Sequence, residues 1–282
     1  MLNQERIYLN AFKTPQEARA GFDQWMAIIM SVLIQAWLES NNMLDGLFPE
    51  GVITETAAPW MWSAELTHEE KAIIENAVDK RRREFAAGRT CARYILRQFG
   101  FSGDLTIGKD KYGAPIWPEG ITGSISHTDD VCVVSIGRQK QKLTSLGVDV
   151  EKDTGLDPDL VDLVCDEIEK ETCCTGQIGD RLRLAKVIFS AKESVYKCLY
   201  PLIKTVLDFQ DVHIQLDASG EKFTGSTNGN LHGDFARGIC NGRVFHEAGY
   251  IYTSCTFGAR PNRPQNGDSA AEQGEKARIS CE

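Results

Sequence analysis

The chain has 282 residues, of which 42% are hydrophobic and 25% are charged, and its formal net charge is -9. This composition is ordinary for a globular protein with one large or two small domains, and the acidic balance argues against nucleic-acid binding through a basic surface. The nine cysteines show no zinc-binding spacing, so we expect reduced thiols in a cytoplasmic protein.

The N-terminal region contains an uncharged, mostly apolar run at residues 25–34. It is shorter than the ~20 residues that a membrane helix needs, so we expect no membrane span. We favour a buried or amphipathic helix, and a membrane-associating element or a segment outside the functional domain stay open as alternatives. Met43 starts a turn-rich segment, and residues 1–43 are therefore predicted to be an N-terminal extension.

Residues 44–145 are predicted to form a first half that mixes strands with helix. Residues 52–66 look extended, although Pro59 weakens that pattern. Three further segments have strand character: a strand–turn–strand unit at 104–117, a glycine- and hydroxyl-rich turn leading into a strand at 120–127, and an apolar strand at 131–137.

The helix of this half is predicted to begin at a capping box. Thr67 is placed to cap the first turn, and Glu70 can reach back from the third helical position. The helical pattern continues to about Phe99, with a break near Gly88. Gly100 is the expected terminator, because glycine readily adopts the left-handed conformation that ends many helices.

Residues 146–257 are predicted to form a second half of the same kind. A polar, basic linker at 138–145 precedes it. The pattern then indicates a strand at 146–151, helices at 157–175 and 180–200, and strands at 211–217 and 244–257. The last segment, 258–282, is rich in Pro, Gly and polar residues and cannot bury a core, so we expect a disordered tail.

Two acidic residues, one apart on the predicted strand, suggest a metal site. Asp149 and Glu151 alternate with valines, so both side chains point to one face. On the later helix, Glu193 and Lys197 share a face at i and i+4. Magnesium is usually held by carboxylates together with substrate phosphates, so the combination predicts a Mg²⁺ site beside a phosphate. Solvated surface charges are the simpler interpretation of each pair alone.

Positive charge is concentrated in the first half of this acidic chain. A dense cationic run at 80–83 precedes Arg89 on the predicted helix, and Lys109 and Lys111 lie on a nearby predicted turn. Guanidinium groups suit phosphates because their donors form a planar fork. A solvated helix face is the simpler interpretation of the run in isolation.

The segment at 120–127 ends in Ser126 and His127. Glycine- and hydroxyl-rich backbones approach phosphates closely, and a histidine can donate to one. Neither of the common glycine-rich nucleotide-binding motifs is present, and a structural histidine is the simpler interpretation of His127 alone.

In combination and order, these elements resemble the surfactin-type 4′-phosphopantetheinyl transferases, in the branch typified by enterobactin synthase component D. The matching stretches are KRRREFAAGRTCARYILRQFG at 80–100, APIWPEGITGSISHTDD at 114–130, LGVDVE at 146–151 and FSAKESVYK at 189–197. The resemblance covers roughly residues 44–257. It implies an α+β fold of two similar halves related by a pseudo-twofold axis, with coenzyme A bound in the cleft between them.

The resemblance also implies a reaction. The phosphopantetheine arm of coenzyme A passes to a serine of an apo acyl, aryl or peptidyl carrier protein, with Mg²⁺ as cofactor, and adenosine 3′,5′-bisphosphate is released. We expect a monomer, because the two halves complete one site. The pathway of the carrier stays open among siderophore, polyketide and fatty acid synthesis.

Site residues carry over from the matching motifs. The family's metal-binding acids correspond to Asp149, Glu151 and Glu193. Glu193 also matches the proposed general base toward the carrier serine, Lys197 is expected to neutralise or protonate the leaving phosphate, and Lys192 is expected to contact the pyrophosphate. The side chains expected to bind coenzyme A are Arg81, Arg89, Lys109, Lys111, Ser126 and His127.

Two other functions stay open. The first is a non-catalytic paralogue that only binds carrier proteins, although such a module would not need Asp149, Glu151, Glu193 and Lys197 together. The second is a Mg²⁺-dependent phosphohydrolase, for which no water-activating base is evident beyond these acids.

Overall fold

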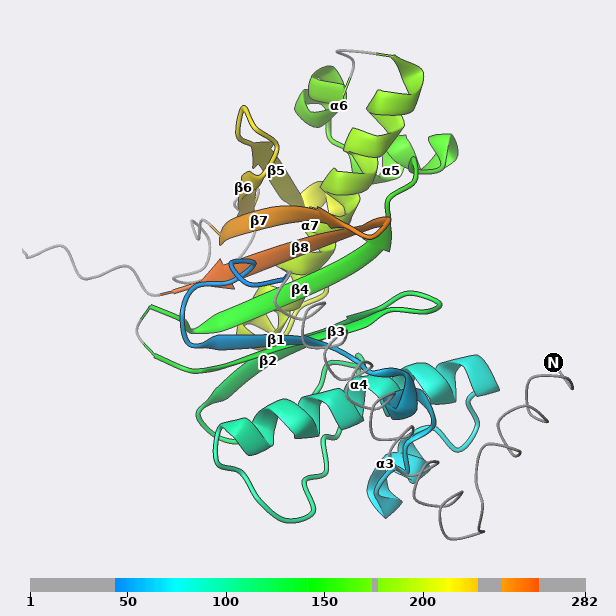
Figure 1. Ribbon diagram of the computed structural model, residues 1–282. Coiled ribbons are helices and arrows are strands. Elements are labelled where there is room, and N and C mark those ends of the chain that lie inside the picture. Colours follow the sequence, from blue (N-terminus) through cyan, green and yellow to red (C-terminus); the bar gives the residue numbers. More distant parts are fainter. Residues whose placement is uncertain (1–43, 141, 174–176, 228–239, 259–282) are drawn as a thin grey trace, which may run out of the picture.

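The computed structural model describes residues 44–140, 142–173, 177–227 and 240–258, so the predicted extension at 1–43 and nearly all of the predicted tail at 258–282 lie outside the described residues. The described chain has an α+β fold of two antiparallel sheets, each packed against one long helix (Figure 1). Among these residues, no helix has the length and apolar character needed to cross a membrane.

The first sheet has the strand order β1-β3-β2. Its strands are β1 (Val52–Thr56), β2 (Ile121–His127) and β3 (Cys132–Arg138). Val134 and Ile136 of β3 belong to the core under the long helix, whereas Val133 belongs to a core shared with the second sheet. Burial on both faces explains why this segment reads as a continuous apolar run rather than an alternating one.

Three helices follow β1: the 3-10 helix η1 (Pro59–Ser63), α3 (His68–Ile73) and α4 (Asp79–Gln98). The predicted extended segment 52–66 is therefore strand only at its start. The capping box of Thr67 and Glu70 is confirmed, and Gly100 has the left-handed φ of 90° expected of a terminator.

The predicted break near Gly88 is wrong. The helix is interrupted earlier, between α3 and α4, and α4 runs through Gly88 without a break. A Cβ on Gly88 would lie 2.9 Å from Cγ2 of Ile125 on β2. Glycine is therefore required here because the helix packs closely on the sheet.

The second sheet has the order β4-β8-β7-β6-β5. Its strands are β4 (Ser145–Lys152), β5 (Val212–Leu216), β6 (Lys222–Thr227), β7 (Cys240–Glu247) and β8 (Tyr250–Phe257). The predictions for β4 and β5 are confirmed. The predicted single strand 244–257 is a hairpin, because Ala248 and Gly249 have positive φ and turn the chain back. No prediction covered β6.

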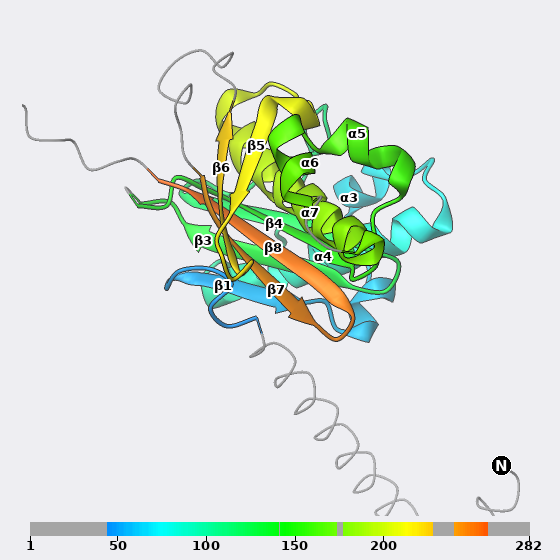
Figure 2. The same cartoon turned by 90° about the horizontal axis from the view of Figure 1, so that it is seen from above.

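The helices of this half are η2 (Pro158–Leu160), α5 (Val161–Val164), α6 (Glu167–Cys173), α7 (Ile178–Ile203) and η3 (Phe209–Asp211). The predicted helix 157–175 is thus divided. Asp166 accepts from the amide of Glu169, and Glu169 accepts from the amide of Asp166. This reciprocal cap starts a new helix at α6. The long helix predicted at 180–200 is confirmed as α7, which lies across β4 and β8 (Figure 2).

The two sheets meet where β2 runs beside β4. Serine hydroxyls bridge this seam: Ser124 donates to the carbonyl of Val148 at 3.5 Å, and Ser126 accepts from the amide of Val150 at 3.3 Å. The predicted strand pair at 104–117 is instead an irregular segment with one isolated bridge between Lys109 and Pro115. Residues 121–127, predicted as a turn leading into a strand, are strand β2 itself.

All cysteines of the described residues are free and buried, and their reduced state stays a prediction. Each long helix packs on its own sheet, as the resemblance implies. The pseudo-twofold relation between the halves stays a prediction.

Candidate active site

Helix α7 crosses strand β4 at very close range because β4 carries a glycine at the crossing. A Cβ on Gly147 would lie 2.0 Å from the carbonyl oxygen of Ser194, so any larger residue would collide with the helix backbone. The close approach brings Asp149 and Glu151, the next inward side chains along β4, against side chains of α7.

Asp149 is the centre of a buried polar network. Its side chain is 3% exposed. Oδ1 accepts from Ser126 Oγ at 2.8 Å and from Lys197 Nζ at 2.6 Å, and Oδ2 accepts from Ser190 Oγ at 2.7 Å. One carboxylate therefore joins β2, β4 and α7. The simpler interpretation of a solvated strand-edge acid does not apply to Asp149.

Glu151 and Glu193 lie beside this network. Glu151 Oε2 is 2.9 Å from Lys186 Nζ. Burial raises the pKa of Glu193; Lys197 opposes that rise, and the negative charges of Asp149 and Glu151 add to it. Within the described residues, the Glu193 carboxylate accepts no hydrogen bond. The predicted acids and Lys197 thus share one electrostatic site.

A cavity of about 180 Å³ opens next to Lys197, between β2 and the end of α7; its lining includes Trp117, Ser124, Tyr196 and Tyr200. A smaller cavity of about 80 Å³ shares Gly113, Pro115 and Ile125 with it. Four of the predicted coenzyme A ligands line this second cavity: Arg81, Arg89, Lys109 and His127. The cations therefore line the smaller cavity, and Lys197, which contacts Asp149, lines the larger one; Asp149, Glu151 and Glu193 are not among the lining residues of either cavity.

The cations of the smaller cavity are held in defined positions. Arg81 Nη1 is 2.6 Å from His127 Nε2. Arg89 donates to the carbonyl oxygens of Ile107 and Gly108 and lies 4.3 Å from the centre of the Phe85 ring. Burial lowers the pKa of Arg89 to about 10, so the group stays charged at neutral pH.

His127 is set to be neutral in this arrangement. Burial lowers its pKa most; Glu84 opposes the shift, and the positive charges of Arg81 and Lys197 add to it. The Nδ1 atom lies 3.6 Å from Glu84 Oε2. A negatively charged ligand in the cavity would favour proton uptake by this histidine.

The prediction for Lys192 is wrong. Its side chain is 2% exposed and points away from the carboxylates. Nζ lies 2.7 Å from Glu169 Oε2 and donates to the carbonyl oxygens of Val164 and Phe209. An ammonium with its donors satisfied in the core cannot contact a substrate pyrophosphate, so Lys192 joins α5, α6 and η3 to α7.

Two predicted coenzyme A ligands also have other contacts. The hydroxyl of Ser126 donates to Asp149 and accepts from Lys197 and from the amide of Val150, which uses its full hydrogen-bonding capacity. It positions Asp149 rather than contacting a phosphate. Lys111 is exposed, with its ammonium 4.7 Å from the centre of the Tyr112 ring. It does not line the smaller cavity, which we call the cation cavity.

Two residues of the carboxylate network were missed in the sequence. Ser190 and Lys186 lie on α7 at positions that, with Glu193 and Lys197, follow the spacing of one helix face. That spacing is visible in the sequence and was the available signal. Ser190 also contacts Asp149 and, at 2.9 Å, Thr253. These contacts depend on strand pairing, so they are not visible in the sequence.

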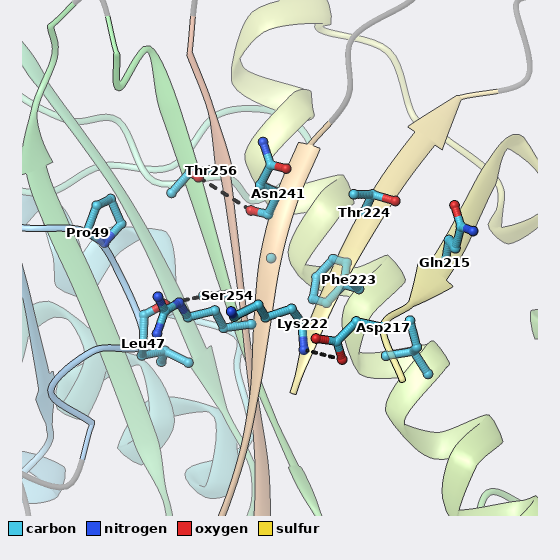
Figure 3. A pocket seen from close by; sticks show the side chains of 13 residues that line it. Leu47, Pro49, Gln215, Asp217, Lys222, Phe223, Thr224, Asn241, Ser254 and Thr256 are labelled. Carbon is cyan, nitrogen blue, oxygen red and sulfur yellow. Dashed lines mark hydrogen bonds between the residues drawn. The ribbon is translucent and has the colours of Figure 1, made fainter. Parts of the chain in front are cut away.

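A separate hollow of about 700 Å³ lies on the face of the second sheet that points away from α7 (Figure 3). Figure 3 shows its polar lining from β6, β7 and β8, including Lys222, Asn241 and Thr256, with Leu47 and Pro49 at its edge. None of the predicted site residues lines it.

The carboxylates suit a hard cation such as Mg²⁺, which prefers oxygen ligands. Oδ2 of Asp149 accepts one hydrogen bond and keeps a second lone pair. Glu193 accepts none from the described residues. Burial raises its pKa most, and a cation would offset both the burial and the repulsion from Asp149 and Glu151. The chemistry of the three carboxylates therefore suits Mg²⁺. Among the described residues, however, Asp149, Glu151 and Glu193 do not form a group whose ligand atoms all lie within 4.8 Å of one another, so a bound cation would have to draw them together.

Two family models match this chain. Residues 69–137 match the 4′-phosphopantetheinyl transferase N-terminal domain, and residues 145–252 match the 4′-phosphopantetheinyl transferase superfamily. The two matches cover the cation cavity and the carboxylate network in turn.

Individual relatives agree with these matches. The chain is 32% identical to the 4′-phosphopantetheinyl transferase Npt of Nocardia iowensis, over 68% of this chain and 84% of that protein. It is 33% identical to the 4′-phosphopantetheinyl transferase PptT of Mycobacterium tuberculosis, over 56% of this chain and 68% of the relative. It is 32% identical to enterobactin synthase component D of Escherichia coli, over 51% of this chain and 66% of that protein.

Proposed function

Because this chain belongs to the 4′-phosphopantetheinyl transferase superfamily, we propose that it transfers the phosphopantetheine arm of coenzyme A to a serine of an apo carrier protein. The observation that carries the proposal is the contact of Lys197 with Asp149 beside a cavity that adjoins a second one, lined by Arg81, Arg89, Lys109 and His127. The charges of Lys197, Asp149 and Glu151 also act on Glu193. A pyrophosphate with further phosphate groups needs both kinds of neighbour.

The cation cavity would bind the phosphates of coenzyme A. Arg81 and Lys109 present positive charge that is exposed at the cavity, and Arg89 contributes charge from its wall. His127 would gain a proton as the phosphates enter, because its lowered pKa reflects burial and the positive charges around it. Binding at this end fixes the position of the pyrophosphate relative to the carboxylates.

The carboxylates would hold Mg²⁺, with Asp149, Glu151 and Glu193 as its protein ligands. A bound Mg²⁺ supplies Lewis-acid stabilisation of a pyrophosphate. The raised pKa of Glu193 suits a second role as the base that takes the proton of the carrier serine. Lys197 would neutralise the phosphate that leaves, and Ser126 and Ser190 would keep Asp149 in position.

In the transfer, the serine oxygen forms a bond to the β-phosphorus of coenzyme A. The bond from that phosphorus to the bridging oxygen breaks, and the electron pair leaves with adenosine 3′,5′-bisphosphate. The serine proton goes to Glu193. The described side chains assigned to these roles all come from one chain, so we propose that a monomer contains the complete site.

The test is intact-protein mass spectrometry of an apo carrier incubated with the purified protein, coenzyme A and Mg²⁺. We expect the carrier to gain the mass of one phosphopantetheine group, and EDTA to prevent the gain. Because one relative is named for enterobactin synthesis, the panel should include aryl and peptidyl carriers of siderophore synthesis beside acyl carriers of polyketide and fatty acid synthesis. An unmodified panel would contradict the transferase assignment, and hydrolysis of coenzyme A without a carrier adduct would favour the phosphohydrolase.

A further inference from the structure

Three cysteines that are far apart in the sequence meet in the core of the second half. Cys198 comes from α7, Cys240 from β7 and Cys255 from β8, and their sulfur atoms all lie within 4.8 Å of one another. Figure 2 shows α7 lying against this part of the sheet. None of the three belongs to the proposed transferase site.

The cluster is closed to solvent. Each of the three residues is 0% exposed. Burial raises the pKa of Cys198 and of Cys255 well above the usual range, so both are neutral thiols at physiological pH, whereas hydrogen bonds from these two thiols lower the pKa of Cys240. Among the described residues, the groups that influence the three sulfurs are the thiols themselves and the Ser145 hydroxyl. In the part of the chain that the structure describes, no lysine or arginine is among the main influences on these three thiols.

The spacing of the sulfurs suits a single central atom. Three sulfurs bound to one atom at about 2.3 Å lie about 4 Å apart when the arrangement is planar, and closer when it is pyramidal. The separation of at most 4.8 Å therefore needs a contraction of up to about 1 Å to reach the planar arrangement, and a larger one to reach the pyramidal arrangement. Thiolates also select soft ions over the hard cations that the carboxylate site prefers.

Charge decides which soft ion fits. A divalent ion bound by three thiolates leaves one negative charge in the core, and an unpaired buried charge is costly. A trivalent ion bound by the same thiolates is neutral. We propose that Cys198, Cys240 and Cys255 form a binding site for trivalent thiophilic ions of the arsenite class.

The reaction with arsenite balances without an oxidant. Three thiols and one As(OH)₃ give one As(S-Cys)₃ and three waters: three As–S bonds form, three As–O bonds and three S–H bonds break, and arsenic stays trivalent. Because the thiols are enclosed, entry requires local opening of α7 over the sheet. Binding should therefore be slow, with a rate that stops rising at high arsenite concentration.

The experiment uses the full chain, reduced and then treated with sodium arsenite. The Cys165→Ala/Cys173→Ala variant removes a competing pair of thiols that lie within hydrogen-bonding distance of each other. We expect native mass spectrometry to show one arsenic per chain in the wild type and in this control, and arsenic-edge X-ray absorption to show three sulfur neighbours. Cys240→Ala and Cys255→Ala should each retain arsenite about tenfold or more less tightly.

Thermal melting without arsenite shows whether Cys240→Ala and Cys255→Ala fold. If these variants do not fold, X-ray absorption of the arsenic bound to the Cys165→Ala/Cys173→Ala control shows whether it has three sulfur neighbours. The proposal is overturned if the bound arsenic has two sulfur neighbours, if the control loses it, or if both folded alanine variants retain it undiminished. It is likewise overturned if Cd²⁺ occupies the three sulfurs and arsenite does not bind.

Discussion

The ammonium of Lys197 lies 2.6 Å from Oδ1 of Asp149 and also donates to Ser126 Oγ, so one side chain of α7 ties together a strand from each sheet. Lys197 is 25% exposed, whereas Asp149 is almost fully buried. The charge of Asp149 is thus balanced from inside the protein, and its position depends on three donors. This dependence makes Asp149 a structural residue as well as a proposed metal ligand.

Asp149→Asn should abolish transfer and also weaken the fold. The amide would turn a donor toward Ser126, Ser190 or Lys197, which already donate to this position. We expect a loss of about 1–3 kcal/mol in the free energy of unfolding. The transfer rate should fall by roughly 100-fold or more, since the group acts where charge develops. Urea titration and the carrier mass assay measure the two effects.

The matched control for this change is Asp104→Asn, which alters an exposed acid that is not among the hydrogen-bond partners of Asp149. It should leave stability and transfer unchanged. Full activity in the Asp149→Asn variant would show that the carboxylate network is not the catalytic site.

Two lysines on α7 should behave in opposite ways. Lys197→Met removes a proposed catalytic charge, and we expect the transfer rate of the folded protein to fall by roughly 100-fold. Lys192→Met removes the ammonium beside the buried Glu169 carboxylate, which keeps its hydrogen bonds from two backbone amides. We expect a loss of about 3–5 kcal/mol of stability, with normal activity for each folded molecule.

The double variant Lys192→Met/Glu169→Gln separates charge from packing. It leaves no unpaired buried charge, so it should recover part of the stability lost by Lys192→Met alone. If Lys192→Met lowers the transfer rate and leaves the melting temperature unchanged, Lys192 acts in the active site after all.

The sequence predicted the parts of the site that depend on local spacing. Asp149 and Glu151 share a strand face, and Glu193 and Lys197 share a helix face, because these periodicities are fixed by backbone geometry. It did not predict that Lys192 is buried, since the same motif contains both lysines and only the packing of α6 against α7 distinguishes them. The three-cysteine cluster was equally hidden, because its members come from separate elements.

Gly147→Ala should disrupt the contact between β4 and α7. The added Cβ would lie 2.0 Å from the Ser194 carbonyl oxygen, and backbone cannot move aside as a side chain can. We expect a loss of at least about 1–3 kcal/mol, measured by thermal or urea unfolding. As control, Gly179→Ala adds a Cβ to the same helix with nothing within 4 Å, and it should stabilise the protein by up to about 1 kcal/mol. Equal stabilities for the two variants would contradict the described crossing.

The binding of coenzyme A should tighten as the pH falls from about 8 to about 6, because His127 must take up a proton beside the phosphates. In the free protein its pKa lies below the ordinary value of about 6.5, so the group is neutral at pH 7 and becomes charged on binding. Isothermal titration calorimetry in buffers of different ionisation enthalpy should detect this proton uptake, and His127→Gln should remove it.

The same lowered pKa has the opposite effect on the free protein. The unfolded chain binds the proton more readily, so the contribution of His127 to stability is present above about pH 6.5 and is lost as the pH falls toward the folded-state pKa. Urea titrations at several pH values should show wild-type stability declining in this range more than that of His127→Gln. Coenzyme A affinity that is independent of pH, with no proton uptake, would place the phosphates away from His127.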